Sequence, residues 1–247
     1  MNAKVAVFGA TSAIAAEVAR VHAERGDRLC LIGRDASKLD AVTRRLGGAV
    51  AGSIAADFDE LSAARALVSR ASDALGGLDT ALIAHGLLGD QLTSEHDVVE
   101  AERIIRSNFT SAVALLIPLA NALEERRAGR LGVISSVAGE RGRPRNYTYG
   151  ASKAALTVYL QGVRSRLYGA GVSVTTIKLG PVNTPMTATH AKNALFAEPG
   201  AVARDIVAAM DAKRAEVFVP RRWAAIMPVV RHTPEALFQR LGFLSGR

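Results

Sequence analysis

Apolar and polar positions divide the chain into two kinds of segment that follow one another in a regular order. Short runs that are apolar almost without interruption, typical of strands covered on both faces, alternate with longer segments that have helical spacing. The predicted strands are residues 5–8, 29–33, 48–56, 80–84, 131–135, 172–178 and 217–219. The predicted helices are residues 12–25, 37–46, 61–75, 98–126, 148–168 and 200–213. This order predicts a three-layer α/β fold, with a doubly wound parallel sheet of about seven strands and helices on both faces.

The composition indicates a single domain that spans residues 1–247. Hydrophobic residues make up 49% of the chain, enough for a sizeable core, and no Pro/Ser-rich linker or repeat divides it. The longest apolar run, residues 111–123, is shorter than the roughly 20 residues of a membrane-spanning helix and contains Pro118. A signal peptide is not expected, and the only cysteine, Cys30, excludes an internal disulfide. We therefore expect a cytoplasmic protein, without a bound metal because no Cys/His cluster has ligand spacing.

The net charge of +8 is concentrated in the C-terminal tail, about residues 221–247, and the strand before it. Seven Lys/Arg against two Glu in residues 213–247 give +5 of the total. Apolar residues lie between these charges: Trp223, Ile226, Met227, Val229, Val230, Leu237, Phe238, Leu241, Phe243 and Leu244. Such a tail fits a helix on a membrane surface, a subunit contact or a cover over a substrate pocket, and these alternatives stay open. Nucleic acid is not an expected partner, because the arginines are scattered and no recognition module is present.

A turn of small residues follows the first predicted strand and leads into a helix. Gly9 permits the tight bend, and the small side chain of Ala13 lets a pyrophosphate approach the backbone at the start of the helix. The turn keeps only one glycine, so its position after the first strand is stronger evidence than its amino-acid sequence. The alternative is that it is an ordinary tight turn. This position predicts the dinucleotide site of a Rossmann-type sheet. The predicted contacts are Gly9, Thr11, Ser12, Ala13 and Ile14.

The end of the second predicted strand indicates which nicotinamide cofactor binds. NAD enzymes usually place a carboxylate here, which accepts a hydrogen bond from the adenosine ribose. This chain has Gly33, which offers no side chain, followed by Arg34, whose guanidinium can hold a 2′-phosphate with two hydrogen bonds. The sequence therefore favours NADP(H) over NAD(H). The alternative is that Arg34 is a solvated loop charge and that Asp35 only caps the next helix.

Three polar residues near the fifth predicted strand have a spacing that indicates catalysis. Tyr149 and Lys153 are four residues apart at the start of a predicted helix, so both side chains lie on one face. Ser136 stands just past the fifth strand, whose carboxyl end meets the same edge of the sheet. A tyrosine and a lysine at this spacing are common by chance. They are not common after such a strand and serine within a βα repeat.

These residues and several motifs make the chain similar to the short-chain dehydrogenase/reductase family over essentially its whole length. The matching pieces are GATSAIA at 9–15, Asp57 after the third strand, Asn108 in the fourth helix, ISSVAG at 134–139, YGASK at 149–153 and GPVNTPM at 180–186. Each piece alone is common, but together they are specific for the family. The chain departs from the family pattern at Ala13 and Ala15, which replace two glycines, and at residues 83–86, where Ile-Ala-His-Gly replaces Asn-Asn-Ala-Gly.

The resemblance implies an NADP(H)-dependent enzyme that interconverts carbonyl and alcohol groups, with Tyr149 as the general acid. It implies that Lys153 and the nicotinamide charge lower the pKa of Tyr149, and that Lys153 also binds the nicotinamide ribose. Ser136 would polarise the carbonyl, and Asn108 would hold a water for proton relay. The implied catalytic residues are thus Asn108, Ser136, Tyr149 and Lys153. The implied cofactor contacts are Arg34, Asp57, Ala84, His85, Gly86, Tyr149, Lys153, Val182 and Thr184, with His85 a local hydrogen-bond partner rather than a base.

The loop before Tyr149 gives one clue to the substrate. It contains Arg141, Arg143 and Arg145, which either hold an anionic head group, lie in solvent or form a subunit contact. Together with the tail, they resemble the decaprenylphosphoryl-2-keto-erythro-pentose reductase-like subgroup. That resemblance implies a lipid-linked, polyprenyl-phosphoryl keto-sugar and peripheral contact with a membrane. The alternatives are a soluble small-molecule ketone or 3-oxoacyl substrate, and a non-catalytic NADP-binding scaffold.

The fourth predicted helix indicates self-association. Its segment 111–123 is apolar nearly all round, more than one core-facing stripe requires. The resemblance points the same way, since the family commonly pairs this helix and the helix that carries Tyr149 across two-fold axes. We therefore expect a homodimer or a homotetramer.

Overall fold

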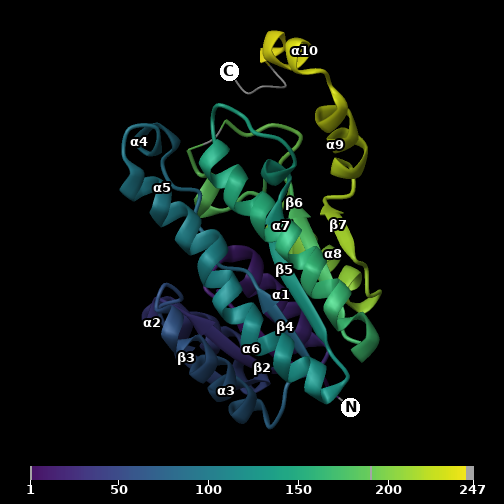
Figure 1. The fold of residues 1–247 in the computed structure, drawn as a ribbon. Coiled ribbons are helices and arrows are strands. Elements are labelled where there is room, and N and C mark those ends of the chain that lie inside the picture. The colour runs from purple at the N-terminus through teal and green to yellow at the C-terminus, as the bar shows by residue number, and fades with distance from the viewer. Residues whose placement is uncertain (1, 190, 243–247) are drawn as a thin grey trace.

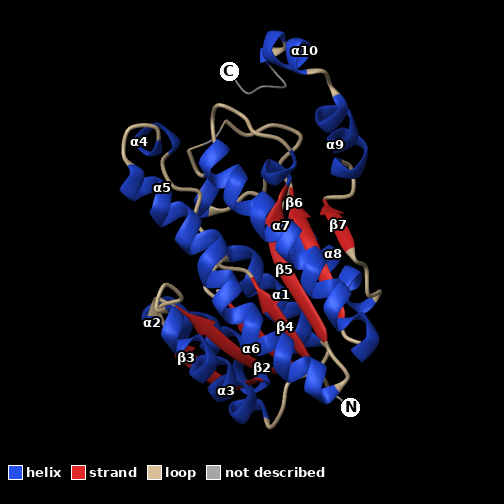
Figure 2. Cartoon of the chain, in the orientation of Figure 1, coloured by secondary structure: helices blue, strands red, loops and turns tan. Residues whose placement is uncertain are grey.

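Seven parallel strands form one sheet with helices on both faces, in a computed structural model that describes residues 2–189 and 191–242 (Figures 1 and 2). The strands are β1 (Lys4–Phe8), β2 (Arg28–Gly33), β3 (Val50–Ala55), β4 (Thr80–Ile83), β5 (Arg130–Ser136), β6 (Ser173–Leu179) and β7 (Glu216–Val219). Their order is β3-β2-β1-β4-β5-β6-β7, and every pairing is parallel. The predicted fold and all seven predicted strands are confirmed. The chain order reverses between β1 and β4, where such sheets bind ligands at the carboxyl ends of the strands.

Two apolar layers, one on each face of the sheet, explain why the central strands have few polar residues. One layer contains α1 (Ala13–Glu24), α2 (Ala36–Leu46) and α8 (Pro199–Asp211), and the other contains α3 (Ala64–Leu75), α6 (Ser111–Arg126) and α7 (Tyr147–Leu167). Along β1, Val5 and Val7 join the first layer, whereas Ala6 and Phe8 join the second. Side chains alternate between the faces along a strand, so a strand covered on both sides is apolar at every position.

The two edge strands are less covered than the sequence pattern predicted. In β3 only Ile54 is buried, and in β7 only Val219 is buried. An edge strand has a neighbour on one side only, so the helices reach over less of it. The strand β3 also begins at Val50, two residues later than predicted, because Gly47–Ala49 forms a 3-10 turn. A short helix that the periodicity did not predict, α4 (Gln91–Ser94), follows β4.

The predicted helix 98–126 is continuous but contains a π turn. It consists of α5 (Val98–Ile105), the π turn Arg106–Thr110 and α6. Residues 111–123 alone are too short to span a bilayer, but the whole of Val98–Arg126 is long and apolar enough to do so by length and composition only. Half of the most apolar stretch of this helix is buried inside the protein, as in a core helix that packs on a sheet.

The C-terminal tail forms two helices, α9 (Trp223–His232) and α10 (Glu235–Arg240), beyond the carboxyl end of β7 (Figure 1). Its apolar residues differ in exposure: Trp223, Met227, Val230 and Phe238 are buried, Ile226 and Leu241 are partly buried, Val229 and Leu237 are exposed, and Phe243 and Leu244 lie outside the described residues. The buried ones form a cluster with Val137, the residue after Ser136. The tail therefore packs beside the candidate catalytic segment.

Candidate active site

A cavity of about 610 Å³ at the carboxyl ends of the strands brings together most of the predicted site residues. Its walls contain the four predicted catalytic residues, Asn108, Ser136, Tyr149 and Lys153. They also contain the predicted cofactor contacts Thr11, Ser12, Ala13, Ile14, Ala84, His85, Gly86, Val182 and Thr184. Arg34 lines a small adjoining cavity, whose wall also includes His85 and Gly86. Gly9 and Asp57 line neither of these two cavities.

The turn after β1 packs tightly against the segment after β4. Gly9 has a φ of 88°, and a Cβ on it would lie 2.6 Å from the backbone nitrogen of His85, so only glycine fits. Gly9 therefore shapes the turn rather than the cavity wall. Ser12 is the N-cap of α1, and its Oγ accepts a hydrogen bond from the nitrogen of Ala15 at 3.2 Å. The first N–H groups of α1 thus lie at the cavity wall, an arrangement that suits a phosphate.

The segment after β2 places two cations near this turn. Arg34 lies in the small cavity and forms no ion pair within the described part of the chain. Lys38, which the sequence did not single out, lines the main cavity. Asp35 caps α2 by accepting a hydrogen bond from the nitrogen of Lys38 at 3.0 Å, which is the role that the alternative interpretation of this segment gave it. Asp57 is a turn residue in this structure, since its Oδ1 accepts from the nitrogen of Asp59 at 3.0 Å.

His85 is a neutral residue of the cavity wall. Its ring stacks on Phe58 with the centroids 4.4 Å apart, and its Nε2 lies 2.8 Å from Oγ of Ser111. The Ser111 hydroxyl donates to the carbonyl of Ser107, so it accepts from Nε2–H, and Nδ1 is left as an unprotonated acceptor. Burial, together with nearby cations, lowers the pKa of His85 to about 3. His85 thus makes the local hydrogen bond expected of it, while its Nδ1 is buried without a partner.

Tyr149 and Ser136 are neighbours in the cavity. Burial raises the pKa of Tyr149, and the Ser136 hydroxyl acts in the opposite direction. The lowered pKa expected from the resemblance is therefore not produced by the protein's own groups, because desolvation outweighs the hydrogen bond from Ser136. The Nζ of Lys153 lies 5.9 Å from the ring centroid of Tyr149. Ser136 Oγ accepts from the nitrogen of Ala138 at 3.1 Å and donates to the carbonyl of Leu179 at 3.3 Å. This second hydrogen bond is long, so a closer acceptor can replace it.

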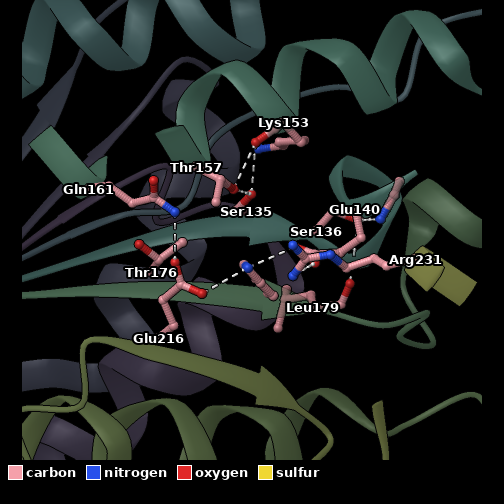
Figure 3. Close-up of polar contacts among 12 residues, drawn as sticks. Ser135, Ser136, Glu140, Lys153, Thr157, Gln161, Thr176, Leu179, Glu216 and Arg231 are labelled. Carbon is pink, nitrogen blue, oxygen red and sulfur yellow. Dashed lines mark hydrogen bonds and ion pairs between the residues drawn. The ribbon is translucent and has the colours of Figure 1, made fainter. Parts of the chain in front are cut away.

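Lys153 is a buried lysine one helical turn after Tyr149. Its Nζ donates to the carbonyl of Ile134 at 3.0 Å. Its own carbonyl accepts from Ser135 at 3.1 Å and from Thr157 at 2.9 Å (Figure 3). These hydrogen bonds fix the start of α7 against the end of β5. Burial lowers the pKa of Lys153 to about 8, so the amine is still largely protonated at neutral pH. Two of its three protons remain for a ligand.

The π turn places Asn108 at the cavity, but its side chain is already engaged. Asn108 Nδ2 donates to the carbonyl of Leu87 at 2.8 Å, and its Oδ1 accepts from the nitrogen of Leu87 at 2.9 Å. A Cβ on Gly86 would lie 2.5 Å from this Oδ1, so the contact requires glycine there. A relay water would have the backbone carbonyl of Asn108, or the second N–H of its amide, as a partner. Single π turns of this kind frequently occur at functional sites.

Arg141 joins the loop after β5 to the tail. Its guanidinium donates to the carbonyls of Val230 at 2.7 Å and Thr233 at 2.5 Å, and it forms an ion pair with Glu235 at 2.6 Å. It also lies over the ring of Phe238, 3.8 Å from the centroid. The expectation that Arg141 binds an anionic ligand or lies in solvent is thus wrong, because contacts within the chain satisfy it.

The other two loop arginines have a different environment. Arg143 and Arg145 line the main cavity, and Trp223 of the tail lines it as well. The tail therefore contributes part of the wall, which was one of the alternatives that its sequence left open. Trp223 gave a signal in the sequence as the only tryptophan in the chain, but its position at the cavity depended on the fold.

A buried ion-pair network connects the same loop to the sheet and to the tail (Figure 3). Lys178 of β6 is 4% exposed and pairs with Glu140 at 2.7 Å and with Glu216 of β7 at 2.8 Å. Glu140 also pairs with Arg231 of α9 at 3.3 Å. Glu140 and its neighbour Arg141 thus both bind the tail. The sequence did not indicate this network, because its members come from four separate segments.

Comparison with known proteins gives the same class as the site. The short chain dehydrogenase family model matches residues 3–194. An uncharacterized oxidoreductase of Streptomyces coelicolor is 35% identical over 237 residues, which cover 95% of this chain and 94% of the relative. The ketoacyl reductase HetN of a Nostoc species is 30% identical over 222 residues, which cover 87% of this chain and 77% of the relative. The crystal structure of a short chain dehydrogenase from Burkholderia cenocepacia in complex with NADP has a TM-score of 0.84 at 23% identity, over 97% of this chain and 98% of the neighbour.

This chain belongs to the short-chain dehydrogenase/reductase family, and it is an oxidoreductase that acts on alcohol and ketone groups with a nicotinamide cofactor. The family expected from the motifs is confirmed. The described residues fit such a cofactor, because the N-terminus of α1, two cations after β2 and the unpartnered Nδ1 of His85 all lie at the cavities. No group of three or more His, Cys, Asp or Glu among the described residues is placed to hold a metal ion.

Proposed function

We propose that the protein reduces a carbonyl group with NADPH and that Tyr149 supplies the proton. The observation that carries this proposal is that Tyr149, Lys153 and Ser136 line the same cavity as the N-terminus of α1. A dinucleotide that rests its phosphates on α1 therefore shares one space with an acid, a cation and a hydroxyl donor. A non-catalytic scaffold would not need this set of side chains around the cavity.

Bound NADPH would supply the hydride for the carbonyl carbon. The phenol of Tyr149 donates its proton to the carbonyl oxygen as negative charge develops there, a contribution of about 10²- to 10⁴-fold in rate. The raised pKa of Tyr149 keeps the phenol protonated at neutral pH, which is the state that a general acid needs. Ser136 exchanges its long hydrogen bond to Leu179 for one to the same oxygen and stabilises the developing charge.

Lys153 acts on both the cofactor and Tyr149 in this proposal. One of its protons bonds to Ile134, and the other two are available for the ribose hydroxyls of the nicotinamide half. With a pKa of about 8, the ammonium stays charged at neutral pH and stabilises the phenolate once the proton has left. Asn108 keeps the segment after β4 in place, and its backbone carbonyl is the proposed site of a relay water.

NADP(H) is the proposed cofactor rather than NAD(H). Arg34 has no acidic partner in the described structure, and Lys38 lines the main cavity. Gly33 ends β2 without a side chain, and Asp35 is engaged in capping α2, so the carboxylate expected of an NAD enzyme is not supplied there. The Burkholderia neighbour was solved with NADP, which supports the same choice.

For the substrate we propose a lipid-linked keto-sugar of the polyprenyl-phosphoryl type. The outer face of α9 supports this choice, since Ala224, Ala225 and Val229 are exposed beside the exposed Arg221 and Arg222. Such a face suits an anionic membrane, where each arginine contributes about 1 kcal/mol. The alternative is a soluble ketone or 3-oxoacyl substrate, which the name of the HetN ketoacyl reductase supports.

An NADPH-oxidation assay over a panel of ketones tests the proposed function. The panel contains short soluble ketones, 3-oxoacyl thioesters and a polyprenyl-phosphoryl keto-sugar, each with and without detergent. We expect turnover with at least one of these classes and a background rate with Tyr149→Phe. If the wild-type protein binds NADPH but oxidises it with none of them, the scaffold interpretation replaces catalysis.

Co-sedimentation with anionic liposomes separates the two substrate classes. The full chain should bind at low salt and be released at high salt, because screening weakens charge contacts at a surface. Arg221→Glu/Val229→Glu should not bind, while its NADPH affinity stays unchanged, because both side chains are exposed. This double variant is a sharper test than removal of the tail, since the tail also forms part of the cavity wall through Trp223. Failure of the wild-type protein to bind liposomes would favour a soluble substrate.

A further inference from the structure

The charge of the main cavity is strongly one-sided. Among its described lining residues are four cationic side chains, Lys38, Arg143, Arg145 and Lys153, and no aspartate or glutamate. Lys38 follows β2, at the end where the adenosine half of the cofactor is proposed, and Lys153 is proposed to bind the nicotinamide ribose. Two guanidinium groups therefore remain at the substrate end without an assigned partner. A cavity lined by one sign of charge attracts ligands of the other sign.

Arg143 is the unusual member of this group. It is partly buried, its Nε is buried with no hydrogen-bond partner, and it forms no ion pair within the described residues. Burial lowers the pKa of its guanidinium, and no acidic group of the protein acts in the opposite direction. A partly buried cation that has no partner in the free protein is readily explained if a ligand pairs with it.

Other partly buried arginines of this chain are satisfied. Arg141, two residues earlier on the same loop, bonds two carbonyls and a carboxylate of the tail. Arg164 of α7 donates to the carbonyl of Val174 at 2.9 Å and to Oγ1 of Thr176 at 2.7 Å. The missing partner of Arg143 is therefore a local feature of the cavity, not a general property of arginines in this fold.

We propose that Arg143, with Arg145 beside it in the cavity wall, forms a subsite for an anionic oxygen group of the substrate, a phosphate or a carboxylate. The planar guanidinium offers paired donors that match both groups, and two cations suit a phosphate best. The subsite lies on the loop between Ser136 and Tyr149. A substrate whose anionic group binds there would therefore have its carbonyl group near Ser136 and Tyr149. This inference rests on the proposed function, because it specifies the substrate of the same cavity.

A binding measurement tests the subsite without relying on turnover. Trp223 is the only tryptophan and lines the same cavity, so its fluorescence reports on ligands there. Methyl phosphate is titrated into protein saturated with NADP⁺, with methanol as the neutral control. The wild-type protein should show saturable binding, and Arg143→Met should bind at least about tenfold more weakly. Arg65→Met is the matched control, since Arg65 is exposed on α3 and has no partner within the described structure.

A second arm identifies the source of the anion. Farnesyl phosphate and farnesol in detergent replace methyl phosphate and methanol. Tighter binding of farnesyl phosphate than of methyl phosphate, lost in Arg143→Met, indicates a lipid-linked phosphate, whereas equal binding of the two indicates a soluble one. The inference is overturned if neither phosphate changes the fluorescence, or if Arg143→Met binds them as the wild-type protein does.

Kinetics separate this inference from the proposed function. Dihydroxyacetone phosphate and dihydroxyacetone are compared as matched ketones in the NADPH assay. Arg143→Met should raise KM for the phosphorylated ketone at least about tenfold more than it raises KM for the neutral ketone. An equal effect on both would refute the subsite and leave the proposed function standing. Phosphate binding that depends on Arg143, without reduction of any ketone in the panel, would refute the proposed function and leave the subsite standing.

Discussion

The guanidinium of Arg141 lies over the ring of Phe238, 3.8 Å from its centroid, and thereby joins the loop after β5 to α10. The same guanidinium bonds two backbone carbonyls of the tail. Because the loop begins directly after Ser136, the tail is attached to the segment that carries a proposed catalytic residue. The tail is therefore part of the architecture around the cavity.

Loss of this attachment should destabilise the protein and impair turnover. Arg141→Met removes two hydrogen bonds from a charged donor as well as the ring contact, so we expect the free energy of unfolding to fall by about 1.5–3 kcal/mol. The ion pair with Glu235 adds little, because that carboxylate is exposed. Urea denaturation followed by Trp223 fluorescence measures the change. Arg240→Met, an exposed residue of α10, is the control, and equal stability of the two variants would contradict the expected role of Arg141.

The choice of cofactor depends on the cations after β2. Arg34→Ala should weaken NADPH binding by about ten- to a hundredfold and leave NADH binding unchanged, because only NADPH carries the 2′-phosphate. Lys38→Ala should have the same sign and a smaller effect, since lysine offers a point charge rather than a paired donor. Fluorescence titration of both cofactors measures the affinities. Equal affinity of the wild-type protein for NADPH and NADH would rule out this assignment.

Acid should destabilise the protein through His85. Its pKa is about 3 in the folded state against 6.5 in the unfolded chain, so between pH 3 and 6.5 the unfolded state binds the additional proton. The stabilisation is fully present above pH 6.5 and is lost as the pH falls towards 3, at most about 1.4 kcal/mol per pH unit for one proton. His85→Gln keeps a donor for Ser111 but does not titrate, so its stability should fall less on acidification.

Chemical denaturation at pH 7 and pH 4.5 measures this difference. His22, whose pKa burial also lowers, stays in both proteins and contributes equally to both. His96→Gln is the control, because His96 is exposed. The same loss of stability with acid in His85→Gln and in the wild-type protein would show that His85 does not carry the effect.

Exposed apolar residues on two adjacent helices indicate where copies of the chain meet. Ile105 and Ile117 on the long helix are 41% and 46% exposed, and Val158 on α7 is 65% exposed. Burial of such residues between copies removes apolar area from water, which favours association. Light scattering should give a dimer or tetramer, and Ile117→Glu/Val158→Glu should reduce the mass towards the 26.0 kDa of one chain. A wild-type mass of one chain at micromolar concentration would exclude the predicted oligomer.

The sequence predicted the fold and the main site residues because both depend on local signals. Buried strands such as β1 are apolar at every position, and the turn at Gly9 and the spacing of Tyr149 and Lys153 are visible within a few residues. The edges of the sheet were less accurate. The interior of β3 is partly exposed, although its residues suggest a buried strand, because burial at an edge depends on what covers it.

The features that the sequence did not indicate depend on contacts between distant segments. Lys178 lies in the largely buried strand β6, and its partners Glu140 and Glu216 are far away in the chain. Arg141 and Arg143 look alike in the sequence, yet one is satisfied by the tail and the other faces the cavity. The two arginines differ because the folded tail lies within reach of Arg141, and the sequence did not indicate where the tail packs.

The central claim is that Tyr149 is the general acid of carbonyl reduction, and single-turnover hydride transfer by Tyr149→Phe tests it most directly. The variant is saturated with NADPH and mixed with the ketone that the wild-type protein reduces fastest, and the loss of NADPH absorbance is followed. We predict a rate at least about 10²-fold below that of the wild-type protein, with unchanged affinity for NADPH. A rate above about a tenth of the wild-type value would contradict the assigned role of Tyr149.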